Sequence, residues 1–383
     1  MWPSPRAVSA GATRCYVTAA AGLTVFCFAT PPREALAPAH PAMEAIDLPT
    51  ALRDGTLAQI PAPALTLTAF TAPNAAGNTP MHVAAKYGRL RELPAEFLTP
   101  ETLTLKNDAG YTPLHHAALG GHLDQIPPAL LTAENLARRS NAGVTVVHLA
   151  AANGHLDQIP AALLTAETVQ WKSDIGNTLL HDAAENGMLD RVPAAFLTPA
   201  NLGAKNLGGE TVLHVAAFNN HLAQVPREHL SAAALREATS SGDTVFHAAA
   251  VSGHLEQIPP ELLTHDNLVV ASKSGFTPIH AAAETGQLNK IPVDQLTADL
   301  LLTRNDNGDT PLHAAAYEGH LDQVPSSLLT PERLATRNYD GLTVLRTAVN
   351  RGFVHQLPLA VRPREPGPIR RFLQRLANSR LPF

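Results

Sequence analysis

The chain has 383 residues, of which 45% are hydrophobic and only 5% aromatic, and its formal net charge is −5. Residues 1–42 and 362–383 are rich in arginine, so the part between them is much more acidic than the total suggests. This acidity argues against nucleic acid as a partner, because binding to a phosphate backbone needs a basic surface. Both cysteines, Cys15 and Cys27, precede the acidic part, so neither disulfides nor a cysteine-based zinc site is expected to support the fold.

The first segment, residues 1–42, differs from everything that follows. Arg6 and Arg14 precede an apolar run over residues 16–29, which ends in small residues and two prolines. This order is typical of a secretory signal. Two other interpretations stay open. One is a disordered or over-extended leader, with translation starting at Met43. The other is a short membrane anchor, although the run is shorter than the ~20 residues that a spanning helix needs.

A unit of 33 residues then recurs without insertion or deletion. Each unit begins with a glycine: Gly77, Gly110, Gly143, Gly176, Gly209, Gly242, Gly275, Gly308 and Gly341. A constant period of this length predicts stacked supersecondary units rather than one globular core. The repeats are predicted to occupy residues 77–361. Residues 43–76 are predicted to form an N-terminal capping half-repeat, because residues 55–61 match only the later part of a unit. Positions are counted below from the glycine as position 1.

The first half of a unit predicts a short helix, which the unit at Gly110 illustrates. Thr112, at position 3, is a good N-cap because its hydroxyl can accept from a free amide of the first turn. Pro113 suits the first helical position, where no amide partner is needed. His115 falls where a side chain can reach back to the cap. Two alanines follow, and the helix is expected to stop near Gly120 and Gly121, since glycine permits the left-handed conformation.

A proline at position 18 interrupts the second half of every unit, as Pro127 does here. Because a helix-interior proline costs about 3 kcal/mol, one long second helix is not expected. Residues 123–126 and 128–131 should instead form two separate short turns. Thr132 should then act as a second N-cap, for a last short helix over residues 133–136.

The segment Gly-Tyr-Thr-Pro-Leu-His-His-Ala-Ala-Leu-Gly-Gly-His-Leu at residues 110–123 resembles the signature of the ankyrin repeat. The resemblance extends over about residues 44–361. It implies an all-α solenoid of stacked helix-turn-helix repeats with little or no β structure. The second half, (Ile/Val)-Pro-x-x-Leu-Leu-Thr-x-Glu-Asn-Leu, departs from the family. We interpret the chain as a divergent subfamily with a proline-broken second helix.

The last segment, residues 362–383, is a basic tail. It is proline-rich at first, and then Ile369, Phe372, Leu373 and Leu376 fall on one side of a predicted short amphipathic helix over residues 369–380, with arginines on the other. Basic amphipathic helices can bind membranes or partner proteins. The simpler interpretation is that this helix covers the exposed end of the stack. Contact with a membrane is expected only through this helix or through residues 1–42.

Histidine is abundant, with 18 residues, and most of them occupy repeat positions. Eight lie at position 6, and five lie at position 13: His122, His155, His221, His254 and His320. Equivalent residues of neighbouring repeats should lie ~10 Å apart, too far to share a metal ion bound at ~2 Å. We therefore predict hydrogen bonding between repeats, and no metal, cofactor or small-molecule substrate. The chain also lacks the common nucleotide-binding and hydrolase motifs, so it is not predicted to be an enzyme; a metal-dependent enzyme using these histidines is the disfavoured alternative.

The positions that the repeat does not dictate are the candidates for partner binding. In ankyrin-like proteins partners bind the inter-repeat loops and the first helices, so the resemblance places the candidate surface at Tyr87, Tyr111, Leu119, Phe218, Phe276, Tyr317 and Tyr339. Exposed aromatic residues are common anchors of interfaces. A row of basic residues recurs at position 30: Lys106, Arg139, Lys172, Lys205, Arg304 and Arg337. This row either binds an acidic partner or offsets acids and carbonyl groups within the stack.

The predicted function is protein recognition by a non-catalytic scaffold or adaptor, whose partner is a protein of unknown identity. The alternative is an exported effector that binds proteins of another cell. A cytoplasmic location is expected, or a secreted one if residues 1–42 are a signal peptide. The repeat at residues 209–241 is predicted to be the least stable. It has Asn219 and Asn220 in place of the helix-ending glycine, and His229 and Ala238 where other repeats carry leucine and a basic residue.

Overall fold

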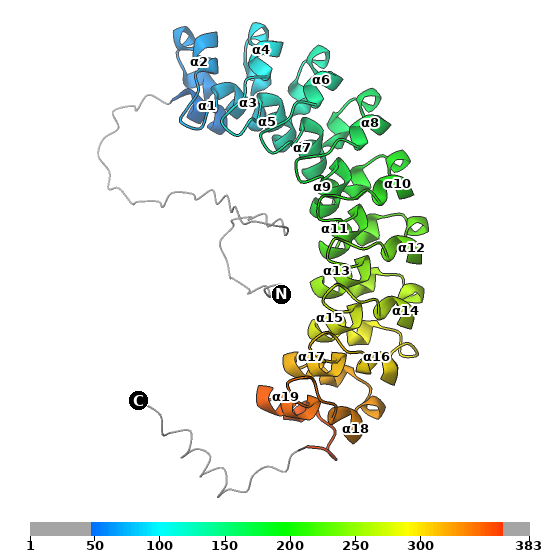
Figure 1. The fold of residues 1–383 in the computed structure, drawn as a ribbon. Helices are drawn as coiled ribbons and strands as arrows, with labels where there is room; N and C mark the ends of the chain where they lie inside the picture. Colours follow the sequence, from blue (N-terminus) through cyan, green and yellow to red (C-terminus); the bar gives the residue numbers. More distant parts are fainter. Residues whose placement is uncertain (1–46, 363–383) are drawn as a thin grey trace, which may run out of the picture. The chain divides into compact units, whose positions relative to one another are not determined.

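The computed structural model describes residues 47–362, and the statements about structure below concern that part of the chain. The predictions for the leader, residues 1–42, and for the tail helix, residues 369–380, lie outside the described residues. A repeat typically consists of a first α-helix, two short 3₁₀ turns and a final α-helix of about one turn (Figure 1). The repeat at Gly275 has only the first of the two 3₁₀ turns, and the described part of the repeat at Gly341 ends after its first 3₁₀ turn without a final helix.

The first helices begin one residue after the repeated threonine. They are α3 Pro80–Lys86, α5 Pro113–Gly120, α7 Val146–Ala152, α9 Leu179–Asn186, α11 Val212–Phe218, α13 Val245–Ser252, α15 Pro278–Glu284, α17 Pro311–Glu318 and α19 Val344–Arg351. The predicted cap is confirmed at α5. The hydroxyl of Thr112 accepts from the His115 amide, and Nδ1 of His115 accepts from the Thr112 amide at 3.1 Å. This reciprocal pair satisfies two of the amides that a helix start leaves unpaired.

Most first helices end on a glycine in the left-handed conformation, such as Gly121 with φ 74°. In the repeat at Gly209, Asn220 takes this role with φ 69°, and it is the one non-glycine residue with positive φ in the described chain. Asparagine tolerates this conformation better than other residues with a Cβ. The backbone turn is therefore the same in a repeat that lacks the glycine.

The second halves confirm the predicted interruption at the proline. The turns before it are η1 Leu57–Gln59, η3 Leu90–Glu92, η5 Leu123–Gln125, η7 Leu156–Gln158, η9 Leu189–Arg191, η11 Leu222–Gln224, η13 Leu255–Gln257, η15 Leu288–Lys290, η16 Leu321–Gln323 and η18 Val354–Gln356. The turns after it are η2 Ala62–Ala64, η4 Ala95–Phe97, η6 Pro128–Leu130, η8 Ala161–Leu163, η10 Ala194–Phe196, η12 Arg227–His229, η14 Pro260–Leu262 and η17 Ser326–Leu328. The final short helices are α2 Leu67–Thr71, α4 Pro100–Leu103, α6 Ala133–Leu136, α8 Ala166–Val169, α10 Pro199–Leu202, α12 Ala232–Leu235, α14 His265–Leu268, α16 Ala298–Leu302 and α18 Pro331–Leu334.

The core is one continuous cluster of small and aliphatic side chains that runs through all the described repeats. First helices pack on the first helices of neighbouring repeats, and the final short helices form a second row beside them (Figure 1). The alanine pair at positions 8 and 9, for example Ala117 and Ala118, is completely buried. Leu123 and Leu136 from the second half are also completely buried. Small residues at the contact allow neighbouring helices to approach closely, and the leucines fill the space between the two rows.

Backbone hydrogen bonds join the loops of successive repeats. The Asn141 amide donates to the Ala109 carbonyl at 3.0 Å, and the Asp174 amide donates to the Ala142 carbonyl at 3.1 Å. Residues 47–362 contain only isolated β-bridges, such as Arg139 with Thr145, and no sheet. The predicted all-α solenoid with little or no β structure is therefore confirmed.

The helix α1, Leu48–Asp54, occupies the place of a first helix before α3 and packs against it. Asp47 caps its start, and Ala51 and Leu52 are completely buried. The sequence analysis found only the later half of a unit here, because this helix lacks the threonine and histidine of the other repeats. Nothing in residues 47–362 forms a helix long and apolar enough to cross a bilayer.

Candidate functional site

The first helices present one accessible side that is not used by the core. Positions 7, 10 and 11 lie on that side because residues three and four apart share a helix face. Position 2 lies in the loop just before the N-cap. We call the side chains at positions 2, 7, 10 and 11 the inner-helix face. Most of its members are half-buried or exposed, and a few, such as Ala281, are buried.

Four of the predicted partner-binding residues lie on exposed positions of this face. Leu119, Phe218 and Tyr317 occupy position 10 and are 38%, 42% and 50% exposed, and Tyr87 at position 11 is 41% exposed. The guanidinium of Arg351 lies over the Tyr317 ring, 4.0 Å from its centroid. The structure therefore places these four on the same side of the first helices, where a partner could contact them. Tyr87 and Leu119 lie in successive repeats, and Phe218 and Tyr317 each lie three repeats further along.

The other three predicted residues differ from these four. Tyr111 and Phe276, both at position 2, are half-buried, and their rings lie 5.5 Å and 5.6 Å from His115 and His280 of their own repeats. Tyr339, at position 32, lies at a loop tip and is 73% exposed. The first two rings thus contribute to the packing of their repeats, which leaves only part of their surface for a partner.

The histidines at position 6 connect each repeat to the next. In α5, Nδ1 of His115 accepts from the Thr112 amide, so Nε2 carries the proton and donates to the Val144 carbonyl at 3.2 Å. The same bond recurs from His82, His148, His181, His214, His247, His280 and His313, each to a carbonyl 29 residues ahead. The predicted role of these histidines in joining repeats is confirmed. Both ring nitrogens are engaged, so neither is available to a metal ion.

Burial keeps these histidines neutral. It lowers the pKa of His115, His148, His181, His214 and His280 to about 4, and it lowers the pKa of His82, His247 and His313. A protonated ring would place hydrogen on Nδ1, where it would meet the threonine amide instead of accepting from it. The hydrogen-bonded arrangement between repeats therefore depends on the neutral ring.

The histidines at position 13 do not form a metal site either. The His155 ring lies against Gly121 of the preceding repeat, where an added Cβ would come within 2.6 Å of it. The glycine is therefore required by contact as well as by its left-handed backbone. Residues 47–362 contain no group of three histidine, cysteine or acidic side chains that could hold a metal ion.

A second connection between repeats was not recognised in the sequence. Oε1 of Gln158, at position 16, accepts from the Leu123 amide at 2.8 Å, and its Nε2 donates to the Gly121 carbonyl at 2.7 Å. Gln125, Gln224 and Gln356 make equivalent bonds. The recurring glutamine of the GHLDQIP block was visible, but its partners lie 35 and 37 residues earlier, and only the stacked geometry reveals them.

The basic row at position 30 makes contacts within the stack. Nζ of Lys106 donates to the Arg139 carbonyl at 2.9 Å, and Nζ of Lys172 donates to the Lys205 carbonyl at 2.8 Å. Arg304 reaches the Arg337 carbonyl in the same way, at 2.8 Å. The sequence left two interpretations of this row, an acidic partner or carbonyl groups of the stack. The geometry favours the second, because the cations donate hydrogen bonds to carbonyl groups of the next repeat.

Position 7 holds two polar residues that depart from the pattern. His116 is half-buried, its ring lies 5.1 Å from that of His82, and its Nδ1 has no hydrogen-bond partner. Burial lowers the pKa of His116 to about 3 and raises the pKa of Asp182 to about 7. The sequence analysis did not single out Asp182 as a candidate site residue. The signal was available, because Asp182 places an acid at the position where other repeats have apolar residues such as Val83 and Leu149.

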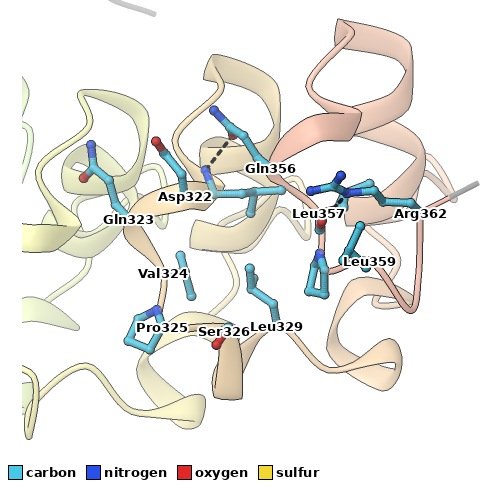
Figure 2. Close-up of a pocket in the computed structure, with 12 residues that line it drawn as sticks. Asp322, Gln323, Val324, Pro325, Ser326, Leu329, Gln356, Leu357, Leu359 and Arg362 are labelled. Atoms are coloured by element: carbon cyan, nitrogen blue, oxygen red, sulfur yellow. Dashed lines mark hydrogen bonds between the residues drawn. The ribbon is translucent and has the colours of Figure 1, made fainter.

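Shallow grooves run between neighbouring second halves. Figure 2 shows one of about 410 Å³, lined among others by Leu329, Gln356 and Leu359. A groove of about 380 Å³, lined by Leu156 to Leu164, Arg191 and Pro193, lies five repeats earlier at equivalent positions. Because the same groove recurs with the repeat, it reflects the stacking geometry and does not single out a ligand site.

The comparisons with known families agree with this geometry. A family model described as "Ankyrin repeats (3 copies)" matches residues 180–258 and 213–293, and one described as "Ankyrin repeat" matches residues 307–330. The chain contains ankyrin repeats. The search of curated proteins found no match. Ankyrin repeats generally mediate protein–protein interaction, and proteins built from them are typically non-catalytic.

Proposed function

We propose that this ankyrin-repeat protein is a non-catalytic scaffold or adaptor that binds a protein partner on its inner-helix face. The observation that carries the proposal is the row of exposed apolar side chains at position 10, Leu119, Phe218, Val251 and Tyr317. Large apolar side chains exposed in register on a regular surface are typical of binding sites. The polar groups of the repeats, in contrast, are largely engaged in bonds between repeats.

The repeating architecture supports a role in binding. The histidine, glutamine and loop bonds fix each first helix relative to the next, so the exposed side chains of position 10 are held on a preorganised surface. A preorganised surface loses less conformational freedom on binding, which favours affinity. The side chains at position 10 differ from repeat to repeat, whereas positions 3, 6 and 16 vary little, so position 10 can provide specificity.

The test begins with identification of a partner by affinity capture from the native organism, followed by measurement of its Kd with purified proteins. We expect Tyr317→Ala and Phe218→Ala each to weaken binding by tenfold or more, as for a central aromatic anchor. Val293→Ala is the matched control, because Val293 is 76% exposed but lies in the second half of its repeat.

Thermal unfolding of each variant checks that the fold is intact. A partner whose affinity is unchanged by both aromatic substitutions, but reduced by Val293→Ala, would place the binding surface on the second halves and contradict the proposal.

A further inference from the structure

The inner-helix face is acidic over a large part of its length. From the repeat at Gly176 to the repeat at Gly308, every charged side chain at positions 2, 7, 10 and 11 is an acid. These acids are Asp182, Glu185, Glu210, Asp243, Glu284, Asp309 and Glu318. The face becomes basic only in the last repeat, where Arg351 occupies position 11.

These seven acids have no cationic partner in the described part of the chain. The ion pairs between repeats lie elsewhere, on loops and second halves, as between Arg139 and Asp174 and between Arg227 and Glu261. On the inner-helix face, Glu210 and Asp309 accept from neutral asparagine amides at 2.8 Å. The acids also repel one another. Burial, and then the charge of Glu318, raise the pKa of Glu284, and burial with the charge of Glu210 does the same for Glu185.

Apolar side chains stand between these acids. Val251 is 37% exposed and Tyr317 is 50% exposed, both at position 10. The packing of Arg351 on the Tyr317 ring shows that this surface accepts a guanidinium against an aromatic face. The surface therefore suits an occupant that combines arginine with aliphatic and aromatic side chains.

The chain contains a segment of that composition. Residues 369–380 carry Ile369, Phe372, Leu373 and Leu376 on one side of a predicted helix and Arg370, Arg371 and Arg375 on the other. The described array ends at Arg362, seven residues earlier. Arg362 lies beside the second halves, where it lines a groove with Asp322 and Leu329, so the segment has to cross to the first helices and then pass one repeat. Seven extended residues span about 23 Å, and the two rows of helices and neighbouring repeats are each ~10 Å apart, so the segment can begin at the repeat of Gly308. A helix of 12 residues is about 18 Å long and would cover two repeats.

We propose that residues 369–380 dock as an amphipathic helix on the inner-helix face of the same molecule, over the repeats at Gly308 and Gly275. Arg370 and Arg375, which border the apolar side of the helix, lie beside Glu284, Asp309 and Glu318, and the apolar side contacts Tyr317 and its neighbours. The docked segment neutralises acids that repel one another. It also occupies part of the surface that we propose for partner binding, so a partner for these repeats has to displace it.

The test is hydrogen exchange of the full-length protein, followed by mass spectrometry of peptides that cover residues 369–380. We expect the amides of this segment to exchange at least tenfold more slowly than an unstructured peptide of the same sequence. In the variant Glu284→Gln/Glu318→Gln the exchange should become at least fivefold faster. The matched control Glu96→Gln/Glu167→Gln changes the charge equally at exposed acids of the second halves and should leave the protection unchanged.

Three results would overturn the proposal. Exchange of residues 369–380 at the unstructured rate would show that the segment does not dock. If residues 369–380 are protected equally in the unsubstituted protein and in the Glu284→Gln/Glu318→Gln variant, the segment covers the end of the stack instead. Protection that grows with protein concentration would assign the docking to a second molecule. The measurement needs no partner protein, so its failure leaves the proposed function untouched.

Discussion

At the scale of single residues, the array depends on side chains that serve two repeats at once. Each position-6 histidine accepts from the threonine of its own helix and donates to a carbonyl of the next repeat. Four of the position-16 glutamines, Gln125, Gln158, Gln224 and Gln356, each join an amide and a carbonyl of the preceding repeat. The polar groups that hold one repeat in place are therefore provided largely by its neighbours, and a repeat cannot be considered in isolation.

The histidines make the stability of the array depend on pH. Their pKa values are lowered in the folded protein to about 4 in five cases, whereas the unfolded chain protonates near 6.5. Between these values the unfolded chain binds more protons, so the free energy of unfolding falls as the pH falls from 6.5 toward 4. Asp182, Glu185 and Glu284 act in the opposite direction because their pKa values are raised, that of Asp182 to about 7, but they are three residues against eight histidines.

Chemical denaturation followed by circular dichroism checks this pH dependence. Between pH 7 and 8 the histidines are neutral in both states, so the denaturant midpoint should change only through the ionisation of Asp182, and it should decrease continuously below pH 6.5. A midpoint that stays constant down to pH 4.5 would contradict the assigned role of the histidines.

Removal of one glutamine of the second connection should be costly. Gln158→Ala leaves the Leu123 amide and the Gly121 carbonyl without their partner, and an unsatisfied buried polar group costs about 1–3 kcal/mol. Gln170→Ala is the control, because Gln170 is exposed. Denaturant unfolding should show the loss for Gln158 and a change within about 0.5 kcal/mol for Gln170.

At the scale of the structural element, the sequence predicted the first helix in detail and the second half in outline. Thr112, Pro113 and His115 act through local rules of helix capping, so the sequence alone sufficed. The proline at position 18 predicted the break in the second half because its effect is also local. The role of Gln158 and the burial of Asp182 could not be derived, since both depend on atoms of a neighbouring repeat. The half-burial of Tyr111 and Phe276 was not foreseen either, because it depends on ring contacts with His115 and His280 that the folded loop of each repeat creates.

The repeat at residues 209–241 remains the predicted weak point of the array. Asn220 holds the left-handed conformation that glycine adopts at lower cost, and Ala238 provides no side chain to reach the carbonyl of the next repeat. Amide exchange in α11 and α12 should therefore be faster than in the equivalent helices α9 and α10. Equal protection of the two repeats in a native-state exchange experiment would disprove this prediction.

At the scale of the whole molecule, two parts of the described surface differ in how their charges are engaged. The loops and second halves carry charges that are paired or that meet carbonyl groups, as with Lys106 and Arg139. The inner-helix face carries unpaired acids and exposed apolar side chains. The total charge of the chain concealed this separation, because the basic ends offset an acidic array. Binding to the inner-helix face should accordingly be sensitive to salt, since unpaired surface charges are screened at high ionic strength.

The constant period also makes the length of the array adjustable. The bond from each position-6 histidine ends 29 residues ahead, and the bonds from Gln125, Gln158, Gln224 and Gln356 at position 16 end 35 and 37 residues behind. If residues 110–142 were excised, His82 would meet the carbonyl of Val144 in place of Tyr111, and Gln158 would meet Leu90 and Gly88 in place of Leu123 and Gly121. The joint would contain only interactions that the protein already uses elsewhere. Such an array can gain or lose whole units by duplication and deletion without new compensating substitutions. Its length can therefore change while the bonds between repeats stay the same.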